Sequence, residues 1–147
     1  MSKNKSSGLT LIIGDIKEIN GQGDRAIVPS SFLEQMKEHD RIFLIKNEYM
    51  ERTYQCYGGP EAVHKIEEEI NGRLKEFRKR IHGLSKEEYT KYVTTFTLYS
   101  EHPIDKQKRI SLPSELRGEK TLVYIPGGDY LLLTTQKQYE KNFIKRE

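Results

Sequence analysis

Two arginines occur in the same short sequence context, one near each end of the chain. Arg25 is followed four positions later by Pro29, and Arg109 is followed four positions later by Pro113. An arginine side chain carries a permanent charge and a planar fork of donors, which can form two parallel hydrogen bonds with guanine in the major groove of DNA. We expect each proline to have a structural role, because proline is well suited to begin a short helix.

Residues typical of a turn precede both arginines. The later segment, 105–108, reads Asp-Lys-Gln-Lys, and the earlier one, 20–24, reads Asn-Gly-Gln-Gly-Asp. Aligning the two starts gives the first copy one extra turn residue. Asp105 and Asn20 then begin the turns, where an oxygen that accepts backbone N–H bonds stabilises the bend.

Lysines flank the later arginine. Lys106, Lys108 and Arg109 lie within four positions, so the lysines can contact phosphates while the arginine contacts a base. The earlier arginine has an acidic neighbour, Asp24, which lowers the local attraction for phosphate. The alternative is that the later segment is only a solvated hairpin tip. The repeated Arg and Pro spacing favours DNA contact, carried mainly by Arg109 and less by Arg25.

The two halves of the chain predict the same order of elements: strand, turn, strand, short helix, hairpin and helix. Alternating and β-branched residues predict the strands, and Gly, Asn and Asp mark the turns. The expected strands are 9–19, 25–28, 41–45 and 49–57 in the first half and 96–104, 109–112, 121–125 and 130–134 in the second, with a terminal helix capped by Thr135. No Pro-, Gly- or Ser-rich linker separates the halves, so we expect one packed unit.

The most regular helix is expected between the halves. Apolar residues recur at three- and four-residue steps over 63–81, which predicts one buried stripe. Gly83 ends this helix, and Ser85 with Glu88 predicts the capping box of another. Mixed charges cover the rest of the long helix, so we expect an exposed, ion-paired face that includes Arg73; a subunit interface is the alternative.

Composition narrows the possible functions. The chain has 147 residues, a net charge of +3 and a pI of about 8.8, which permits binding to a polyanion but does not establish it. The single Cys56 excludes an internal disulfide framework. The start of the chain has no apolar segment long enough for a signal peptide, and the longest apolar runs are too short to span a bilayer. We therefore expect a cytoplasmic protein without a membrane partner.

Catalytic chemistry finds little support. His64 and Glu68 share a helix face, but two ligands do not make a zinc site. The Gly-x-Gly at 21–23 lacks the remaining residues of a phosphate-binding loop. His82 and His102 are expected to be surface or capping residues. The sequence thus predicts no enzyme, no metal, no cofactor and no small-molecule substrate.

The later segment resembles the Asp-x-x-x-Arg-x-x-x-Pro signature of the MraZ family, tandem members of the AbrB/SpoVT-type swapped-hairpin DNA-binding proteins. Asp105, Arg109 and Pro113 match it directly, and the similarity extends over about 12–143. In the earlier copy the Arg and Pro match, with Asn20 in the place of Asp and one residue inserted. Lys108 and Asp24 stand where such proteins commonly have Gly.

This resemblance implies an α+β fold. Two pseudo-symmetric AbrB/SpoVT-like swapped-hairpin β repeats would form one β-rich core, with helices between the repeats and at the C-terminus. The expected segments are a polar tail at 1–8, a first repeat with the long helix at 9–83, and a second repeat at 84–147. The family further implies assembly into a closed homo-oligomeric ring.

The resemblance also implies sequence-specific transcription regulation. Family members bind direct repeats of double-stranded DNA in the promoter of the division and cell-wall gene cluster, and the motif arginines contact the DNA. Carried over, this assigns DNA contact to Arg109 and Arg25, with Lys108 and Lys106 as phosphate contacts, in a cytoplasmic, nucleoid-associated repressor or activator. The alternative is an oligomeric scaffold that keeps the fold without reading DNA sequence.

Overall fold

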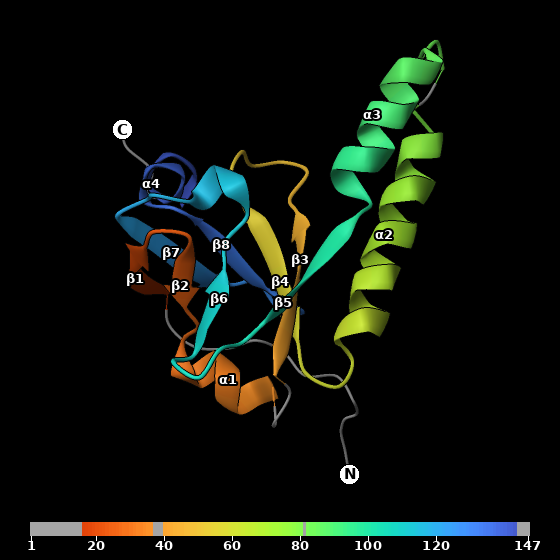
Figure 1. Cartoon of the computed structure of the whole chain (residues 1–147). Coiled ribbons are helices and arrows are strands. Elements are labelled where there is room, and N and C mark those ends of the chain that lie inside the picture. Colours follow the sequence, from red (N-terminus) through yellow and green to blue (C-terminus); the bar gives the residue numbers. More distant parts are fainter. Residues whose placement is uncertain (1–15, 37–39, 81, 144–147) are drawn as a thin grey trace.

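The computed structural model describes residues 16–36, 40–80 and 82–143, which form an α+β fold (Figure 1). The α+β class expected from the sequence is confirmed. The polar tail and the first part of the expected N-terminal strand lie outside the described residues. The elements are β1 (Lys17–Gln22), β2 (Arg25–Ile27), α1 (Ser30–Met36), β3 (Arg41–Lys46), β4 (Tyr54–Gly58), α2 (Ala62–Arg78), α3 (Lys86–Phe96), β5 (Tyr99–Pro103), β6 (Arg109–Ser111), the 3-10 helix η1 (Ser114–Leu116), β7 (Thr121–Pro126), β8 (Leu131–Thr135) and α4 (Gln136–Phe143).

The strands form one antiparallel sheet that curls into a nearly closed barrel. Their order is β5-β3-β4-β8-β7-β1-β2-β6, and the outermost strands, β5 and β6, contact each other. The helical pair α2/α3 stands on one side of the sheet and extends beyond it, whereas α4 lies on another side (Figure 1). Both halves of the chain therefore contribute strands to a single sheet.

The strand pairing is reciprocal between the halves. β1 pairs with β7, and its counterpart β5 pairs with β3. In the first ladder Ile19 lies opposite Leu122, and in the second His102 lies opposite Ile42. The two remaining contacts, β2 with β6 and β4 with β8, join equivalent strands. The sheet thus has an approximate internal two-fold axis, which passes through the β2–β6 pair.

The inward-facing side chains of these strands make the main core. The short helices close the barrel: the N–H of Phe32 donates to the carbonyl of Pro29 at 3.0 Å, and the N–H of Leu116 donates to that of Pro113 at 2.9 Å. The buried members of this core are Ala26, Val28, Phe32, Met36, Ile42, Leu44, Cys56, Ile110, Leu112, Leu116, Leu122, Tyr124, Leu131 and Leu133. Burial of this apolar surface supplies the main driving force for folding.

Backbone hydrogen bonds correct the alignment of the two turns. The N–H of Gly21 donates to Lys120 and the N–H of Ile104 donates to Asp40, so Gly21 is the counterpart of Ile104. The extra turn residue therefore belongs to the second copy and not to the first. The first hairpin closes with only Gly23 and Asp24 between paired strands, because Gly23 adopts a positive φ of 70°.

The first part of the expected strand at 49–57 is also corrected. β4 begins only at Tyr54, because the side-chain oxygen of Asn47 accepts the N–H groups of Tyr49 and Met50 at 2.8 and 2.9 Å. Such a side-chain bond offers the backbone an alternative to a sheet ladder. Arg52, with a φ of 53°, lies within the resulting loop.

The helical pair follows the expected pattern with one important exception. The capping box of α3 is confirmed, since the hydroxyl of Ser85 accepts the N–H of Glu88, and the Glu88 carboxylate accepts the N–H of Ser85. α2 packs on the outer face of β3 and β4 through Ile66 and its neighbours. The exposed position expected for Arg73 is wrong, because its side chain is only 2% exposed.

Candidate nucleic-acid interface

The two motif arginines lie on the same outward face of the β2–β6 pair. Ala26 pairs with Ile110, and both point into the core with no exposed surface. Side chains alternate along a strand, so the flanking Arg25 and Arg109 project from the other face. The register places Arg25 opposite Ser111 and Arg109 opposite Ile27. The internal two-fold axis therefore brings together arginines that are 84 positions apart in the chain.

One carboxylate connects the two arginines. Asp105 Oδ1 accepts the backbone N–H groups of Gln107 and Arg109, both at 2.9 Å. Asp105 Oδ2 accepts the guanidinium Nε–H of Arg109 at 3.0 Å and lies 3.8 Å from the guanidinium of Arg25. Partial desolvation raises the pKa of this carboxyl, but the hydrogen bonds from Arg109 and Gln107 outweigh it and hold the pKa below its usual value.

The two guanidinium groups differ in how firmly they are held. Arg109, whose side chain is 26% exposed, also donates to the side-chain oxygen of Gln22 at 3.1 Å. Arg25, whose side chain is 40% exposed, has only the longer ion pair with Asp105. Arg109 is therefore the more rigidly positioned, and Arg25 has more of its donors available. Sequence reasoning placed the greater weight on Arg109, whereas the geometry gives Arg25 at least an equal part.

The surrounding turns add more positive than negative charge. Lys106 and Lys108 are both exposed beside the arginines. With Asp24 and Asp105, the four cations and two carboxylates give this surface a net charge of +2. Lys108 has a positive φ of 64°, and its N–H donates to the carbonyl of Asp105 at 3.0 Å. The bend that holds this lysine thus requires a conformation that side chains rarely adopt.

The other residues assigned to the turns occupy different places. Asn20 lies within β1, opposite Thr121, and Gln22 takes the position that corresponds to Asp105. The exit of each strand is tied to the opposite turn: the N–H of Val28 donates to Lys108, and the N–H of Leu112 donates to Asp24, both at 2.8 Å. Pro29 and Pro113 follow directly after these exit residues, where α1 and η1 begin.

His102 links the second turn to the barrel, a role that the sequence did not reveal. Its Nδ1 is 2.8 Å from the carbonyl oxygen of Ser111, and its Nε2 is 2.7 Å from the hydroxyl of Ser100. Burial lowers the pKa of this imidazole, while the bond to Ser111 acts in the opposite direction. The expected surface or capping position is wrong, because His102 is buried. The alternation of Ser100 and His102 along the strand was the available signal.

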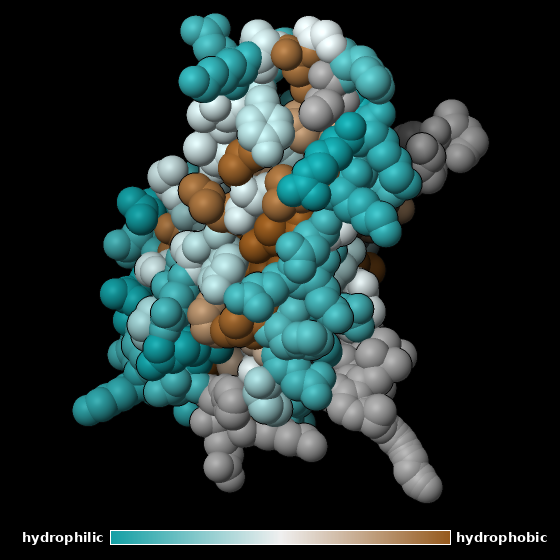
Figure 2. Space-filling view, turned by 90° about the vertical axis from the view of Figure 1, so that its right-hand side faces the viewer, coloured by the Kyte–Doolittle hydropathy of each residue, from teal (hydrophilic) through white to brown (hydrophobic). Residues whose placement is uncertain are grey.

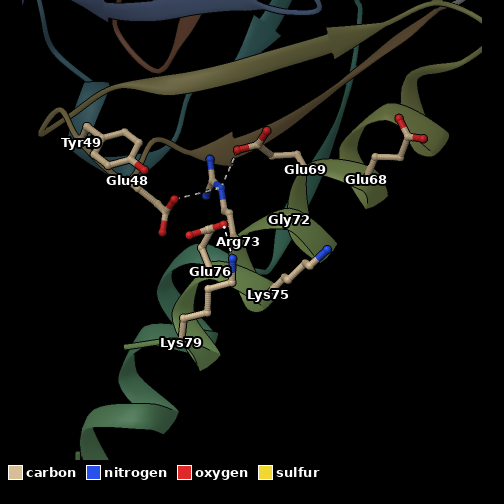
Figure 3. A pocket seen from close by; sticks show the side chains of 9 residues that line it. All are labelled: Glu48, Tyr49, Glu68, Glu69, Gly72, Arg73, Lys75, Glu76 and Lys79. Atoms are coloured by element: carbon tan, nitrogen blue, oxygen red, sulfur yellow. Dashed lines mark hydrogen bonds and ion pairs between the residues drawn. The ribbon is translucent and has the colours of Figure 1, made fainter. Parts of the chain in front are cut away.

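A shallow hollow of about 390 Å³ lies beside α2, and its charged residues bind one another (Figure 3). Arg73 donates to Glu69 at 2.8 Å and lies 3.8 Å from Glu48. The same guanidinium donates to the carbonyls of Lys46 and Phe96 and to the side-chain oxygen of Gln55, at 2.7 to 2.9 Å. Since its donors are engaged within the protein, this arginine joins α2 to the sheet and to the end of α3.

The described residues contain no cluster of three or more potential metal ligands. Among the same residues, no helix is long and apolar enough to cross a membrane. No protein-family model matches the chain, and no curated protein matches it. The functional argument therefore rests on the residues and their geometry.

Proposed function

We propose that the protein is a sequence-specific, DNA-binding transcription regulator of the MraZ type that uses no cofactor. The observation that carries this proposal is the pair of arginines, one from each repeated segment, on one outward face at the internal two-fold axis. A guanidinium fixed on a two-stranded ribbon suits the major groove, which admits such a ribbon. The flanking lysines would contact the phosphates.

The same proposal includes the finer identity of the fold. The reciprocal pairing of β1 with β7 and of β5 with β3 supports two AbrB/SpoVT-like swapped hairpins. In that arrangement each half would complete the other half's part of the barrel. The shared carboxylate of Asp105 would hold Arg109 and Arg25 in a fixed relative position, which lowers the entropy lost on binding.

A single copy offers few phosphate contacts, because the net charge of the arginine surface is small. Linking several copies raises the effective concentration of each further contact, with gains that can reach roughly 10²–10⁴. We therefore include homo-oligomerisation in the proposal. Repeated promoter elements are the matching class of DNA site.

The test begins with selection of bound fragments from a genomic DNA library. Affinity for the recovered site is then measured by fluorescence anisotropy for the wild type, Arg25→Ala, Arg109→Ala and a control, Arg80→Ala on the remote helical hairpin. Loss of either motif arginine is expected to cost about 1–3 kcal/mol of binding free energy and to relax sequence preference. The control should bind almost as the wild type does.

Salt dependence provides a second readout. Phosphate contacts make affinity fall steeply with salt, and Lys108→Ala should reduce that slope by about one contact without changing which sequence is preferred. Undiminished binding by both arginine variants, with folding verified by circular dichroism, would refute the assignment of the interface.

The alternative from a different functional class is an interaction scaffold. The observation that favours it is the exposed apolar surface of the α2/α3 pair, described below. Failure to enrich any DNA sequence, together with self-association of the folded chain, would favour this second function.

A further inference from the structure

The α2/α3 pair exposes an apolar face away from the barrel. α3 is eleven residues long and none of its residues is buried. Figure 2 shows hydrophobic side chains gathered in a band that runs along this side of the molecule, between the two helices and down towards the sheet. Isolated helices of this length are marginal in water, so a helix with so little burial gains from a further partner.

On α2 this face is a stripe with polar ends. Val63, Glu67, Ile70, Leu74 and Arg78 recur at steps of three and four residues, which places them along one edge of the helix. Val63 is 41% exposed, and Ile70 and Leu74 are half-buried. The apolar centre of the stripe is therefore flanked by an acidic residue at one end and a basic residue at the other.

The adjoining helix continues the same pattern. Lys86, Tyr89 and Val93 lie at three- and four-residue steps on α3, with Tyr89 exposed and Val93 half-buried. Tyr89 packs against Phe77 of α2, with ring centroids 5.7 Å apart. Because α3 runs back along α2 from the hairpin tip (Figure 1), Lys86 lies near the same end of the pair as Arg78.

The lower end of the band is open and apolar. Leu98, directly after α3, is 62% exposed. A hollow of about 250 Å³ lies beside Phe43 and Val63, at the start of α2. The face thus combines a basic tip, an apolar middle and a base that carries Glu67.

We propose that this face binds a second copy of the chain, with the two α2/α3 pairs packed antiparallel about a two-fold axis. In that arrangement the basic tip of one copy, Arg78 and Lys86, lies against Glu67 of the other, and the apolar centres meet. A two-fold contact requires a surface complementary to itself after rotation. The opposite charges at the two ends of one stripe provide that complementarity.

This contact differs from the closed ring implied by the family resemblance, because it pairs the same surface on both copies. It also leaves the β2–β6 face of both copies free, since that face belongs to other elements of the barrel. The inference stands independently of DNA binding and is tested without DNA.

The test uses reversed charges in the full-length chain. Sedimentation equilibrium of Glu67→Arg alone and of Arg78→Glu alone should each show dimer affinity weakened by about tenfold or more, because like charges would face each other twice. An equimolar mixture of the two variants should form a heterodimer with affinity restored to within about threefold of the wild type, since both contacts become attractive again. Lys91→Glu, on the opposite side of α3, is the matched control and should leave the dimer intact.

A second variant tests the apolar centre. Val93→Glu places a charge in the middle of the proposed contact and should leave a folded monomer, as judged by circular dichroism and sedimentation. A wild type that stays monomeric at every concentration overturns the proposal. So does an assembly of any size that responds to neither charge reversal, or a mixture that forms no heterodimer.

Discussion

Replacement of Arg73 by Met should destabilise the fold strongly. Methionine keeps much of the aliphatic stem but removes every donor of a guanidinium that is only 2% exposed. The carbonyls of Lys46 and Phe96 and the side-chain oxygen of Gln55 would lose their charged partner. The carboxylate of Glu69 would also lose its partner. The change therefore affects contacts to four separate segments at once.

The magnitude follows from the burial of this network. A single hydrogen bond to a charged group contributes about 1.5–3 kcal/mol, but bonds from one side chain do not add fully. Removal of one partner from a buried ion pair costs about 3–5 kcal/mol, and we expect Arg73→Met to lie in that range. This is a large part of the roughly 5–15 kcal/mol that stabilises a typical domain.

Urea unfolding followed by far-ultraviolet circular dichroism measures this loss. Lys75→Met on the exposed side of the same helix is the matched control and should change stability by at most about 0.5 kcal/mol. A loss below about 1 kcal/mol for Arg73→Met, with an unchanged dependence on urea concentration, would show that the buried network contributes little and would refute this reasoning.

Two further changes test the second turn. Lys108→Gly should raise the free energy of unfolding by about 0.5–1 kcal/mol, because glycine relieves the cost of positive φ while losing more entropy on folding; Lys106→Gly is the control, and a lower melting temperature for Lys108→Gly would contradict this. Because burial lowers the pKa of His102 in the folded chain, the unfolded chain takes up its proton first. Stability should therefore be fully present above about pH 6.5 and fall below it, and His102→Asn should flatten this dependence in urea titrations.

Local features of the chain were predictable where adjacent residues determine them. The capping box of Ser85 and Glu88 forms as expected, because its partners are three positions apart. The periodicity of α2 indicated a helix with one buried face for the same reason. The repeated Arg and Pro spacing also identified the two segments that meet at the internal two-fold axis.

The tertiary structure decided which distant groups meet. Helical periodicity placed Arg73 among charged neighbours, but its burial depends on carbonyls that β3 and the end of α3 supply. The alignment of the turns likewise depended on bonds between the halves, such as that from Ile104 to Asp40. A short sequence comparison cannot reveal such bonds, because it contains only one of the two partners.

The sequence by itself determined the α+β class, the two matching segments and the chemistry of their arginines, because residue type and local spacing carry that information. Only the tertiary structure decided that Arg25 and Arg109 share the carboxylate of Asp105 and that Arg25 keeps the freer guanidinium. Those contacts arise from pairing β2 with β6 across the barrel. Their geometry depends on the closure of the whole sheet and therefore has no local signature.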